Sequence, residues 1–352
     1  MSKSTKRAGT PRFGVTLVDV ARDAGVDQST VSRVLRSDPG ANVTDATRAR
    51  IREAATRLGY VPNATARGLA MRRTSTIGLL VPNAVSLVFA DIIRGATDAA
   101  LELGYVLVLA DASELGRASD AVRKLVLEGR VDGLLIASGT ITDKITNDLI
   151  EGFHNCVVLN RRIGSRLPSV IEDDELGMFL CAQELIDRGH SEVACLAGPE
   201  DIDTSRRRLA GYRRAMREAG LPVRRGSVVH EPFDEAGGYR GMTRILQLRS
   251  PATAVASASL AAAVGAMAAA RDRGISIPDQ LSVTAFHDAP IANYLSPPLT
   301  TVAMPLTQVG REAVLMLDRR LRGEGGASHL TVREPAPQII RRRSVGPPPV
   351  TP

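Results

Sequence analysis

The chain has few cysteines and no long apolar run. Its 352 residues include only Cys156, Cys181 and Cys195, too few and too scattered for a disulfide framework or a zinc site. We expect all three to be buried small hydrophobic residues. No apolar run approaches the roughly 18 residues of a membrane span, and the N-terminus lacks the apolar segment of a secretion signal. These absences predict a cytoplasmic protein.

Signature motifs of several enzyme classes are also missing. The sequence has no G-x-G-x-x-G, no G-x-x-x-x-G-K-[ST] and no H-E-x-x-H, and no serine lies in a G-x-S-x-G turn. Its five histidines are isolated from one another. We therefore expect neither catalysis nor a bound cofactor or metal. A sugar kinase, for example, would need a phosphate-binding glycine loop.

Positive charge is concentrated at the N-terminal end. Residues 1–76 hold 14 Lys and Arg against 6 Asp and Glu, a net charge of +8, whereas the remainder holds 31 against 32. A short basic segment on a nearly neutral body indicates a polyanionic partner such as nucleic acid. The alternative is an ordinary solvated charged surface.

The basic segment carries two short helical patterns in tandem, in VTLVDVARDAGVDQSTVSRVL. Thr16 and Asp19 have the form of a capping box, and Gly25 can adopt the left-handed conformation that ends a helix. Helices this short are unstable alone and must pack on each other, which predicts a helix-turn-helix. A third helix completes the small domain. The apolar faces of the three helices are Leu17, Val20, Ala21 and Ala24; Val31, Val34 and Leu35; and Ile51, Ala54, Ala55 and Leu58.

Short, nearly continuous apolar runs begin at Ile77 and continue through the body. They are IGLLV, YVLVLA, DGLLIA, CVVLN, VACLAG, TAVASA and LSVTAF. Such runs are typical of parallel strands buried on both faces, so the body is predicted to be α/β. About ten strand candidates exceed one sheet and indicate two lobes that separate near Val170–Asp174. Ligands of such sheets bind at the carboxyl ends of the strands.

These segments closely resemble the lactose-repressor (LacI) family of bacterial transcription regulators. The resemblance covers about residues 15–343. It includes the helix-turn-helix, TRARIREAATRLGYVPNATARGLA, QELIDRGH, CLAGPED, RRRLAGYRRAMREAGL and YLSPPLTTVAMP. It implies a repressor that binds a near-palindromic operator as a dimer, under the control of a small carbohydrate or derivative. The family's C-terminal tetramerisation segment is absent, which also favours a dimer.

The resemblance also implies a domain plan. We expect a disordered tail at 1–13, the DNA-binding domain at 14–60, a hinge helix and linker at 61–75, two doubly wound lobes of periplasmic-binding-protein type at 76–343, and a disordered tail at 344–352. The first lobe combines about 76–172 with 302–328. The second combines 173–299 with 330–343.

For DNA, the resemblance assigns the first residues of the second helix to the major groove. Gln28, Ser29 and Arg33 are the expected base-reading positions, and an Arg fork can bind guanine O6 and N7. A phosphate contact is the alternative for Arg33. Backbone contacts are expected from Thr16, Thr30 and Asn42.

The hinge is expected to fold in the minor groove only when DNA is bound. Leu69 matches the leucine that wedges open the central base step, and Asn63 and Arg67 are further DNA-binding candidates. A leucine at helical spacing could instead belong to a hydrophobic core. Gly68 disfavours the free hinge helix by roughly 1 kcal/mol relative to Ala.

For the effector, the matching positions lie on the loops after the strands. Arg208 matches the arginine that commonly binds the effector. The family's usual acids are replaced by Asn160 and His287, so the cleft is expected to lose acid and favour an anion such as a sugar phosphate. Alternatively, His287 is a packed structural residue and the effector is a neutral sugar, or no small molecule is sensed. The full candidate set is Phe89, Ser138, Arg161, Thr204, Arg208, Phe233, Ser259 and His287.

Two other functions fit only part of the sequence. A solute-binding protein would explain the body, but not the basic N-terminal segment or the missing secretion signal. An architectural DNA protein would explain the N-terminal segment but not the two-lobed body, and preference for a palindrome over random DNA would separate it from a regulator.

Overall fold

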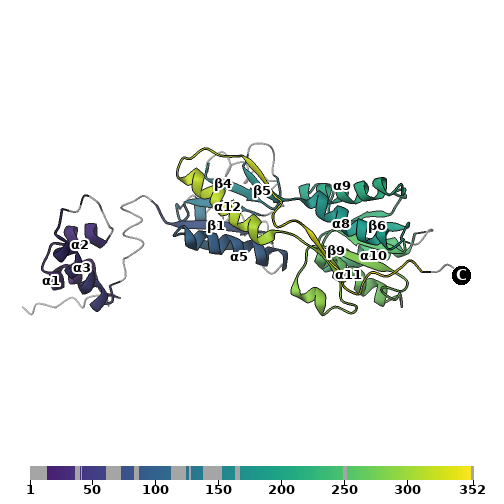
Figure 1. Ribbon diagram of the computed structural model, residues 1–352, viewed down its shortest axis with the longest axis horizontal. Coiled ribbons are helices and arrows are strands. Elements are labelled where there is room, and N and C mark those ends of the chain that lie inside the picture. Colours follow the sequence, from purple (N-terminus) through teal and green to yellow (C-terminus); the bar gives the residue numbers. More distant parts are fainter. Residues whose placement is uncertain are drawn as a thin grey trace, which may run out of the picture. The chain divides into compact units, whose positions relative to one another are not determined.

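The computed structural model describes most of the chain in two separate units. The described residues are 14–35, 40, 42–60, 73–82, 87–111, 124–126, 128–137, 153–162, 167–248 and 252–349. The units are Met1–Thr74 and Ser75–Pro352 (Figure 1), here called the head and the body. The expected tail at 1–13 and most of the expected hinge lie outside the described residues.

The head has the predicted helices, α1 (Leu17–Ala24), α2 (Gln28–Leu35) and α3 (Asp45–Arg57). The capping box at the start of α1 is confirmed, because Thr16 N donates to Asp19 Oδ2 over 3.0 Å and Asp19 N donates to Thr16 Oγ1 over 3.3 Å. Gly25 ends α1 at φ 64°, in the left-handed region. The buried core consists of eight of the eleven predicted apolar residues, and the other three, Leu17, Leu35 and Leu58, are partly buried and pack against it. The eight are Val20, Ala21, Ala24, Val31, Val34, Ile51, Ala54 and Ala55.

Lobe 1 of the body is a fully parallel sheet covered by helices. Its strands are β1 (Thr76–Val81), β2 (Val106–Asp111), β3 (Gly133–Ile136), β4 (Cys156–Leu159), β5 (Ser169–Glu172) and β11 (His329–Val332), in the order β11-β5-β4-β3-β1-β2. Helices α5 (Leu87–Glu102) and α12 (Leu306–Leu321) lie side by side (Figure 1). Their backbones approach so closely that a Cβ on Gly95 would lie 1.9 Å from the Thr307 carbonyl oxygen.

Lobe 2 repeats this plan. Its strands are β6 (Val193–Ala197), β7 (Val228–His230), β8 (Ala254–Ser257), β9 (Ser282–Phe286), β10 (Thr300–Ala303) and the antiparallel β12 (Gln338–Ile340), in the order β12-β10-β9-β8-β6-β7. The helices are α8 (Asp174–Asp187), α9 (Asp203–Glu218), α10 (Glu235–Leu246) and α11 (Leu260–Arg271), with the 3-10 helix η1 (Pro290–Asn293). Helices α8 and α9 pack together, as do α10 and α11, over two separate cores.

The chain passes between the lobes three times. It leaves lobe 1 after β5, returns between β10 and α12, and crosses again between β11 and β12. The expected later boundaries were wrong by a few residues. Residues 302–303 belong to β10 of lobe 2, and β11 pairs with β5 in lobe 1 although 330–343 was assigned to lobe 2. Strand pairing set these boundaries, and the sequence did not reveal it.

All seven quoted apolar runs contain strands, but one differs from expectation. Strand β2 lies at the sheet edge, and its Val106, Val108 and Leu109 are 59%, 36% and 43% exposed. The prediction of burial on both faces was therefore wrong for β2. An apolar run gives the strand but not its place in the sheet.

The expected disorder of the C-terminal tail was also wrong for residues 344–349. Ser344 is fully buried and its hydroxyl donates to the Val283 carbonyl oxygen over 2.6 Å. Gly346 N donates to Ser282 Oγ over 3.0 Å, and buried His190 lies 3.1 Å from the Gly346 carbonyl oxygen. Prolines exclude a helix here, yet an extended segment can still be held by side-chain hydrogen bonds.

The three cysteines are free and buried, as predicted. Burial raises the pKa of Cys156 and Cys195 to about 12 and that of Cys181 further. Within the described residues, no helix is both long enough and apolar enough to span a membrane.

Candidate functional site

In the head, the first turns of α2 present polar side chains to solvent. Gln28, Ser29 and Arg33 are exposed, while Val31 and Val34 on the opposite side enter the core. Ser29 and Arg33 are four residues apart and therefore share a face of the helix. This helix can offer a donor fork, an amide and a hydroxyl to a partner that approaches from solvent.

Asp27 fixes the start of α2. Its carboxylate accepts hydrogen bonds from Ser29 Oγ at 2.6 Å, Thr30 N at 2.9 Å and Thr30 Oγ1 at 2.6 Å. The hydrogen bond from Ser29, followed by those from Thr30, lowers the pKa of Asp27 well below its usual value. Because both hydroxyl hydrogens are engaged, Ser29 and Thr30 are left to accept hydrogen bonds from a partner.

The remaining DNA-binding candidates are placed as follows. Thr16 is the N-cap of α1 and is partly buried, and Asn42 is exposed before α3. Asn63, Arg67 and Leu69 lie outside the described residues.

In the body, the effector candidates meet at the boundary between the lobes. Asn160 and Arg161 follow β4 of lobe 1, Arg208 lies on α9 of lobe 2, and His287 follows β9. Asn160 and His287 have φ values of 65° and 70°, a left-handed conformation that is uncommon for non-glycine residues and frequent at ligand sites. These residues lie at the carboxyl ends of parallel strands, where the sequence predicted the site.

Arg208 lies at the centre of this boundary, with only 4% of its surface exposed. Its Nε donates to Asp174 Oδ1 over 2.6 Å, its Nη1 to the Ala258 carbonyl oxygen over 2.8 Å, and its Nη2 to Glu172 Oε1 over 3.3 Å. The guanidinium also lies over the ring of Phe286 at 4.0 Å. Arg208 therefore already has two carboxylate partners.

Glu172, the last residue of β5, connects the lobes. Its Oε1 also lies 2.9 Å from Nε2 of His287, and both side chains are almost fully buried. Burial acts to raise the pKa of Glu172, but the charge of His287, the hydrogen bond between the two side chains and the charge of Arg208 hold it below its usual value. Burial lowers the pKa of His287, and Glu172 opposes this effect without reversing it.

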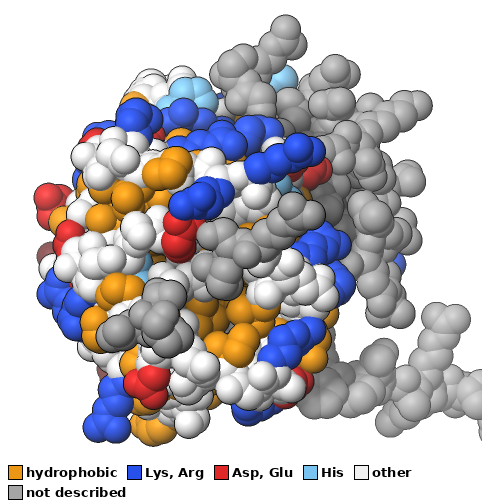
Figure 2. Space-filling model, turned by 90° about the vertical axis from the view of Figure 1, so that its right-hand side faces the viewer, with side chains coloured by type: hydrophobic (Ala, Val, Ile, Leu, Met, Phe, Trp, Pro, Cys, Tyr) orange, Lys and Arg blue, Asp and Glu red, His pale blue; other side chains and the backbone are white. Residues whose placement is uncertain are grey.

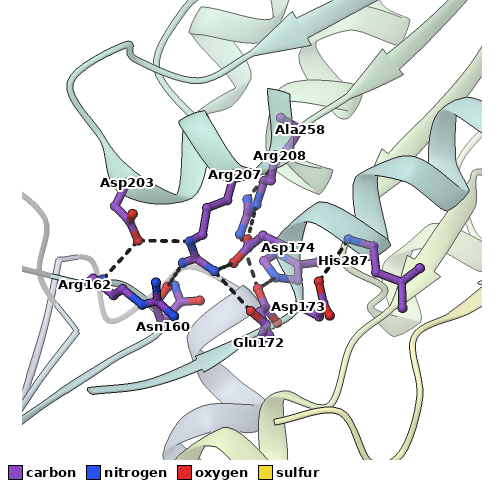
Figure 3. Close-up of polar contacts among 11 residues, drawn as sticks. Asn160, Arg162, Glu172, Asp173, Asp174, Asp203, Arg207, Arg208, Ala258 and His287 are labelled. Atoms are coloured by element: carbon purple, nitrogen blue, oxygen red, sulfur yellow. Dashed lines mark hydrogen bonds and ion pairs between the residues drawn. The ribbon is translucent and has the colours of Figure 1, made fainter. Parts of the chain in front are cut away.

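Arg207, the neighbour of Arg208 on α9, shares Asp174 with Arg208 and binds further groups of both lobes (Figure 3). It pairs with Asp174, and its Nε donates to Asp203 Oδ2 over 3.0 Å. Its Nη1 and Nη2 donate to the carbonyl oxygens of Glu172 and Asn160 over 3.1 and 3.3 Å. One side chain of lobe 2 thus holds the ends of two strands of lobe 1.

The expectation that the cleft loses acid was wrong. Glu172 and Asp174 lie beside Arg208, and burial raises the pKa of Asp174 to about 6 despite the opposing charge of Arg208. The residues flanking the site are three carboxylates and three guanidinium groups, Glu172, Asp174, Asp203, Arg161, Arg207 and Arg208. The excess of positive charge on which the anionic effector was predicted is therefore not present.

The available signal for these acids was the run Glu172-Asp173-Asp174 at the carboxyl end of an apolar strand, at the predicted lobe boundary. The predicted site lay only on the loops after other strands. It therefore missed the acids contributed by the crossing segment itself.

Unpaired polar atoms gather at the same place. Within the described residues, the buried side-chain atoms that lack a hydrogen-bond partner are Asn160 Oδ1, Arg161 Nε, Glu172 Oε2, Ser205 Oγ and His287 Nδ1. Buried polar groups are normally paired, so each exception requires an explanation. Their position at one lobe boundary indicates a site for a polar ligand. Burial lowers the pKa of Arg161 to about 10, which fits a guanidinium that lacks a full set of partners.

The other effector candidates differ in their surroundings. Thr204 is buried on α9, and the Phe233 ring is partly buried 5.3 Å from the Arg208 guanidinium. Ser259 is the N-cap of α11 and donates to the Phe233 carbonyl oxygen over 2.9 Å. Phe89 belongs to the hydrophobic core of lobe 1. Ser138 lies outside the described residues.

Comparisons with known proteins cover both units. Residues 16–63 match the family described as bacterial regulatory proteins, lacI family, and residues 182–345 match a periplasmic binding protein-like domain. The chain is 33% identical to catabolite control protein A of Priestia megaterium, over 89% of this chain and 94% of that protein.

Solved structures agree. A lac repressor dimer bound to operator and the anti-inducer ONPF has a TM-score of 0.80 at 26% identity, covering 95% of this chain and 100% of that one. A complex of the transcriptional regulator CelR with cellobiose has a TM-score of 0.72 at 30% identity, covering 94% and 99%.

Proposed function

Because the chain belongs to the LacI family of bacterial regulatory proteins, we propose that it represses transcription as a dimer on a near-palindromic operator. It is a DNA-binding transcriptional regulator under the control of a small-molecule effector. In the proposed function, α2 enters the major groove and the cleft between the lobes holds a carbohydrate or a close derivative. The protein acts in the cytoplasm and has no catalytic activity.

The observation that supports control by an effector is the set of unpaired buried atoms between the lobes. Groups from β4, β5, α9 and β9 meet there, so a ligand that satisfies them contacts both lobes at once. A ligand that contacts both lobes favours one relative arrangement of them, and differential affinity for two arrangements is what shifts a conformational equilibrium. Effector binding can thereby change operator affinity.

The charge distribution supports assigning DNA binding to the head. The net charge of +8 belongs to residues 1–76. On the face of the body turned toward the viewer in Figure 2, basic, acidic and hydrophobic side chains are interspersed. Neutralisation of DNA phosphates requires concentrated positive charge, so the body is better suited to other partners.

The exposed edge of lobe 1 supports a dimer. Within the described residues, strand β2 pairs only with β1, and its Val106, Val108 and Leu109 are exposed, as is Leu101 at the end of α5. An exposed apolar edge strand promotes association. We assign this edge to a second copy of the chain, whose two-fold symmetry would give a near-palindromic operator.

The test is selection of operator sequences from random DNA with the full-length protein, followed by binding assays. We expect an enriched palindrome, bound at least about 1,000-fold more tightly than random DNA, by a species with the mass of a dimer. Carbohydrates are then added to the complex, and one of them should change operator affinity. Equal affinity for the palindrome and random DNA would instead indicate an architectural DNA protein.

A further inference from the structure

Asp203 and Arg207 lie one turn apart on α9 of lobe 2, and both side chains reach the end of β4 in lobe 1 (Figure 3). Asp203 Oδ2 accepts a hydrogen bond from the backbone N of Arg162 over 3.0 Å. Arg207 Nη2 donates to the carbonyl oxygen of Asn160 over 3.3 Å. The two side chains are also bonded to each other, since Arg207 Nε donates to Asp203 Oδ2 over 3.0 Å. We call this pair of residues the latch.

The place of these contacts in the sheet determines which movement they restrain. Strand β5 carries the chain from lobe 1 to lobe 2, whereas β4 is its neighbour in the sheet and does not cross. The contact between Glu172 and His287 ends on β5 itself, close to the segments about which the lobes turn. The latch reaches one strand further, about 4.8 Å in a sheet. It therefore resists a rotation of the lobes that the contacts on β5 permit.

The latch is held rigidly on the side of lobe 2. Helix α9 lies so close to α8 that a Cβ on Gly211, four residues after Arg207, would lie 2.1 Å from the Glu175 carbonyl oxygen. Arg207 also pairs with buried Asp174, the first residue of α8. On lobe 1 the partners of the latch are main-chain atoms, which cannot follow a movement as a flexible side chain can. Since close-packed elements do not deform continuously, a rotation of the lobes breaks the latch.

We propose that Asp203 and Arg207 are positioning residues that hold the lobes in one closed arrangement without an effector. Every bond of the latch joins two residues of the chain itself, so its formation needs no ligand. The latch sets the fraction of molecules in which both walls of the cleft are already in place, and that fraction scales the apparent affinity of any ligand that needs both walls. The proposal rests on the proposed function only in its consequence for operator binding.

The test measures opening of the cleft by thiol labelling of the full-length protein with no compound added. Ser205 is buried in the wall of the cleft, and Ser205→Cys places a thiol there. The protein without this substitution gives the background of the three buried natural cysteines. Adding Arg207→Met should speed the labelling at least about tenfold, because hydrogen bonds from a charged group are lost. Loss of a nearby cation would by itself raise the pKa of the thiol and slow its reaction, so a faster reaction reports opening.

Two further variants separate the latch from a general effect of charge. Arg206→Met is the matched control, since Arg206 is the exposed neighbour on α9 and its side chain bonds two carbonyl oxygens of lobe 2. It should leave the labelling rate unchanged. Arg207→Lys keeps the charge but lacks the planar fork that reaches Asp203 and Asn160 at once, so it should label as fast as Arg207→Met. Equal rates for Arg207→Met and Arg206→Met, or the natural rate in Arg207→Lys, would overturn the proposal.

A second measurement needs no variant and covers the case in which Arg207→Met does not fold. Hydrogen exchange of the natural protein, read by mass spectrometry with no compound added, reports on the amide of Arg162. Because this amide donates to Asp203 of the other lobe, it should exchange at least about tenfold more slowly than in an unstructured chain. Exchange at the rate of an unstructured chain would mean that the lobes are not latched.

Operator binding is recorded on the same samples, again with no compound added. Arg207→Met should change operator affinity about fivefold or more, in the range of ordinary coupling between two sites, and Arg206→Met should not. If labelling shows an opened cleft while operator affinity stays the same, the latch is supported and the proposed coupling of the cleft to the operator is wrong.

Discussion

The exposed face of α2 and the cleft between the lobes are both polar, but the polar side chains of α2 are exposed to water and those of the cleft are buried from it. The side chains of Gln28 and Arg33 are exposed and make no hydrogen bond to another residue within the described chain, whereas Glu172 and His287 are almost fully buried and paired with each other. DNA is large and charged, and it exchanges its counterions for an exposed basic surface. A small effector must obtain its binding energy from a few groups shielded from water, where each polar contact is stronger and each unpaired group is costlier.

Because of this difference, substitutions in the two regions are expected to have different effects on binding and on folding. Changes on α2 should alter binding and leave folding intact, because the side chains contact little else. Changes in the cleft should alter both, because the same groups hold the lobes and the ligand.

The largest expected effect is on stability in the cleft. Arg208→Met would leave Glu172 and Asp174 buried without their main cationic partner. Breaking a buried ion pair in this way costs about 3–5 kcal/mol of the free energy of unfolding. Urea denaturation of the purified protein measures it. The control is Arg206→Met, an exposed arginine of the same helix whose side chain bonds only backbone carbonyls among the described residues, and it should change stability by less than about 0.5 kcal/mol. If both variants lost the same free energy of unfolding, the ion pairs of Arg208 would not stabilise the cleft more than an exposed arginine does.

The next effect concerns pH. Because burial raises the pKa of Asp174 to about 6, this group stabilises the folded state below its unfolded pKa near 4 and loses that contribution as the pH rises through 6. From about pH 4 to 7, the natural protein should lose up to about 3 kcal/mol relative to Asp174→Asn. Denaturation curves at a series of pH values measure the difference. Parallel pH profiles for the two proteins would mean that Asp174 is not perturbed in this way.

On the α2 face, Arg33→Met should weaken operator binding without changing the stability of the head. A lost arginine contact to guanine costs about 1–3 kcal/mol of discrimination, so affinity for the selected operator should fall more than affinity for random DNA. Binding titrations on both DNAs measure the ratio. An equal loss on both would make Arg33 a phosphate contact, the alternative left open by the sequence.

The smallest expected effect tests the start of α2. Asp27→Ala removes the acceptor of Thr30 N and of two hydroxyls, and the melting temperature of the head should fall by a few degrees. Asp27→Asn keeps an oxygen in the cap position and should lose less, since Asn is as good an N-cap as Asp. If the two variants melt alike, the cap contributes little.

For the head, much could be predicted from local pattern. The stripe that includes Val20 and Val31 forms the core, and the Thr16–Asp19 capping box is present with the expected partners. Short helices with clear caps are determined by residues within a few positions of one another. Local apolar runs likewise predicted seven strands of the body.

Prediction failed where a feature depends on distant partners. The exposure of Val106 follows from the edge position of β2, and the ordered Ser344 depends on Val283, some sixty residues away. The lobe assignment of β11 depends on its pairing with β5. No local pattern carries this information.

For the cleft, too, some features could be predicted from the sequence and others depend on contacts between distant residues. The sequence by itself determined the family, the helix-turn-helix, the α/β body and the sheet edge at which a ligand is predicted to bind, because spacing and motif are local properties. Only the tertiary structure brought Glu172 to His287 and gave Arg208 its two carboxylates. The reason is physical: the charge of a buried site is the sum over residues from several elements, and those elements meet only when the chain has crossed between its lobes.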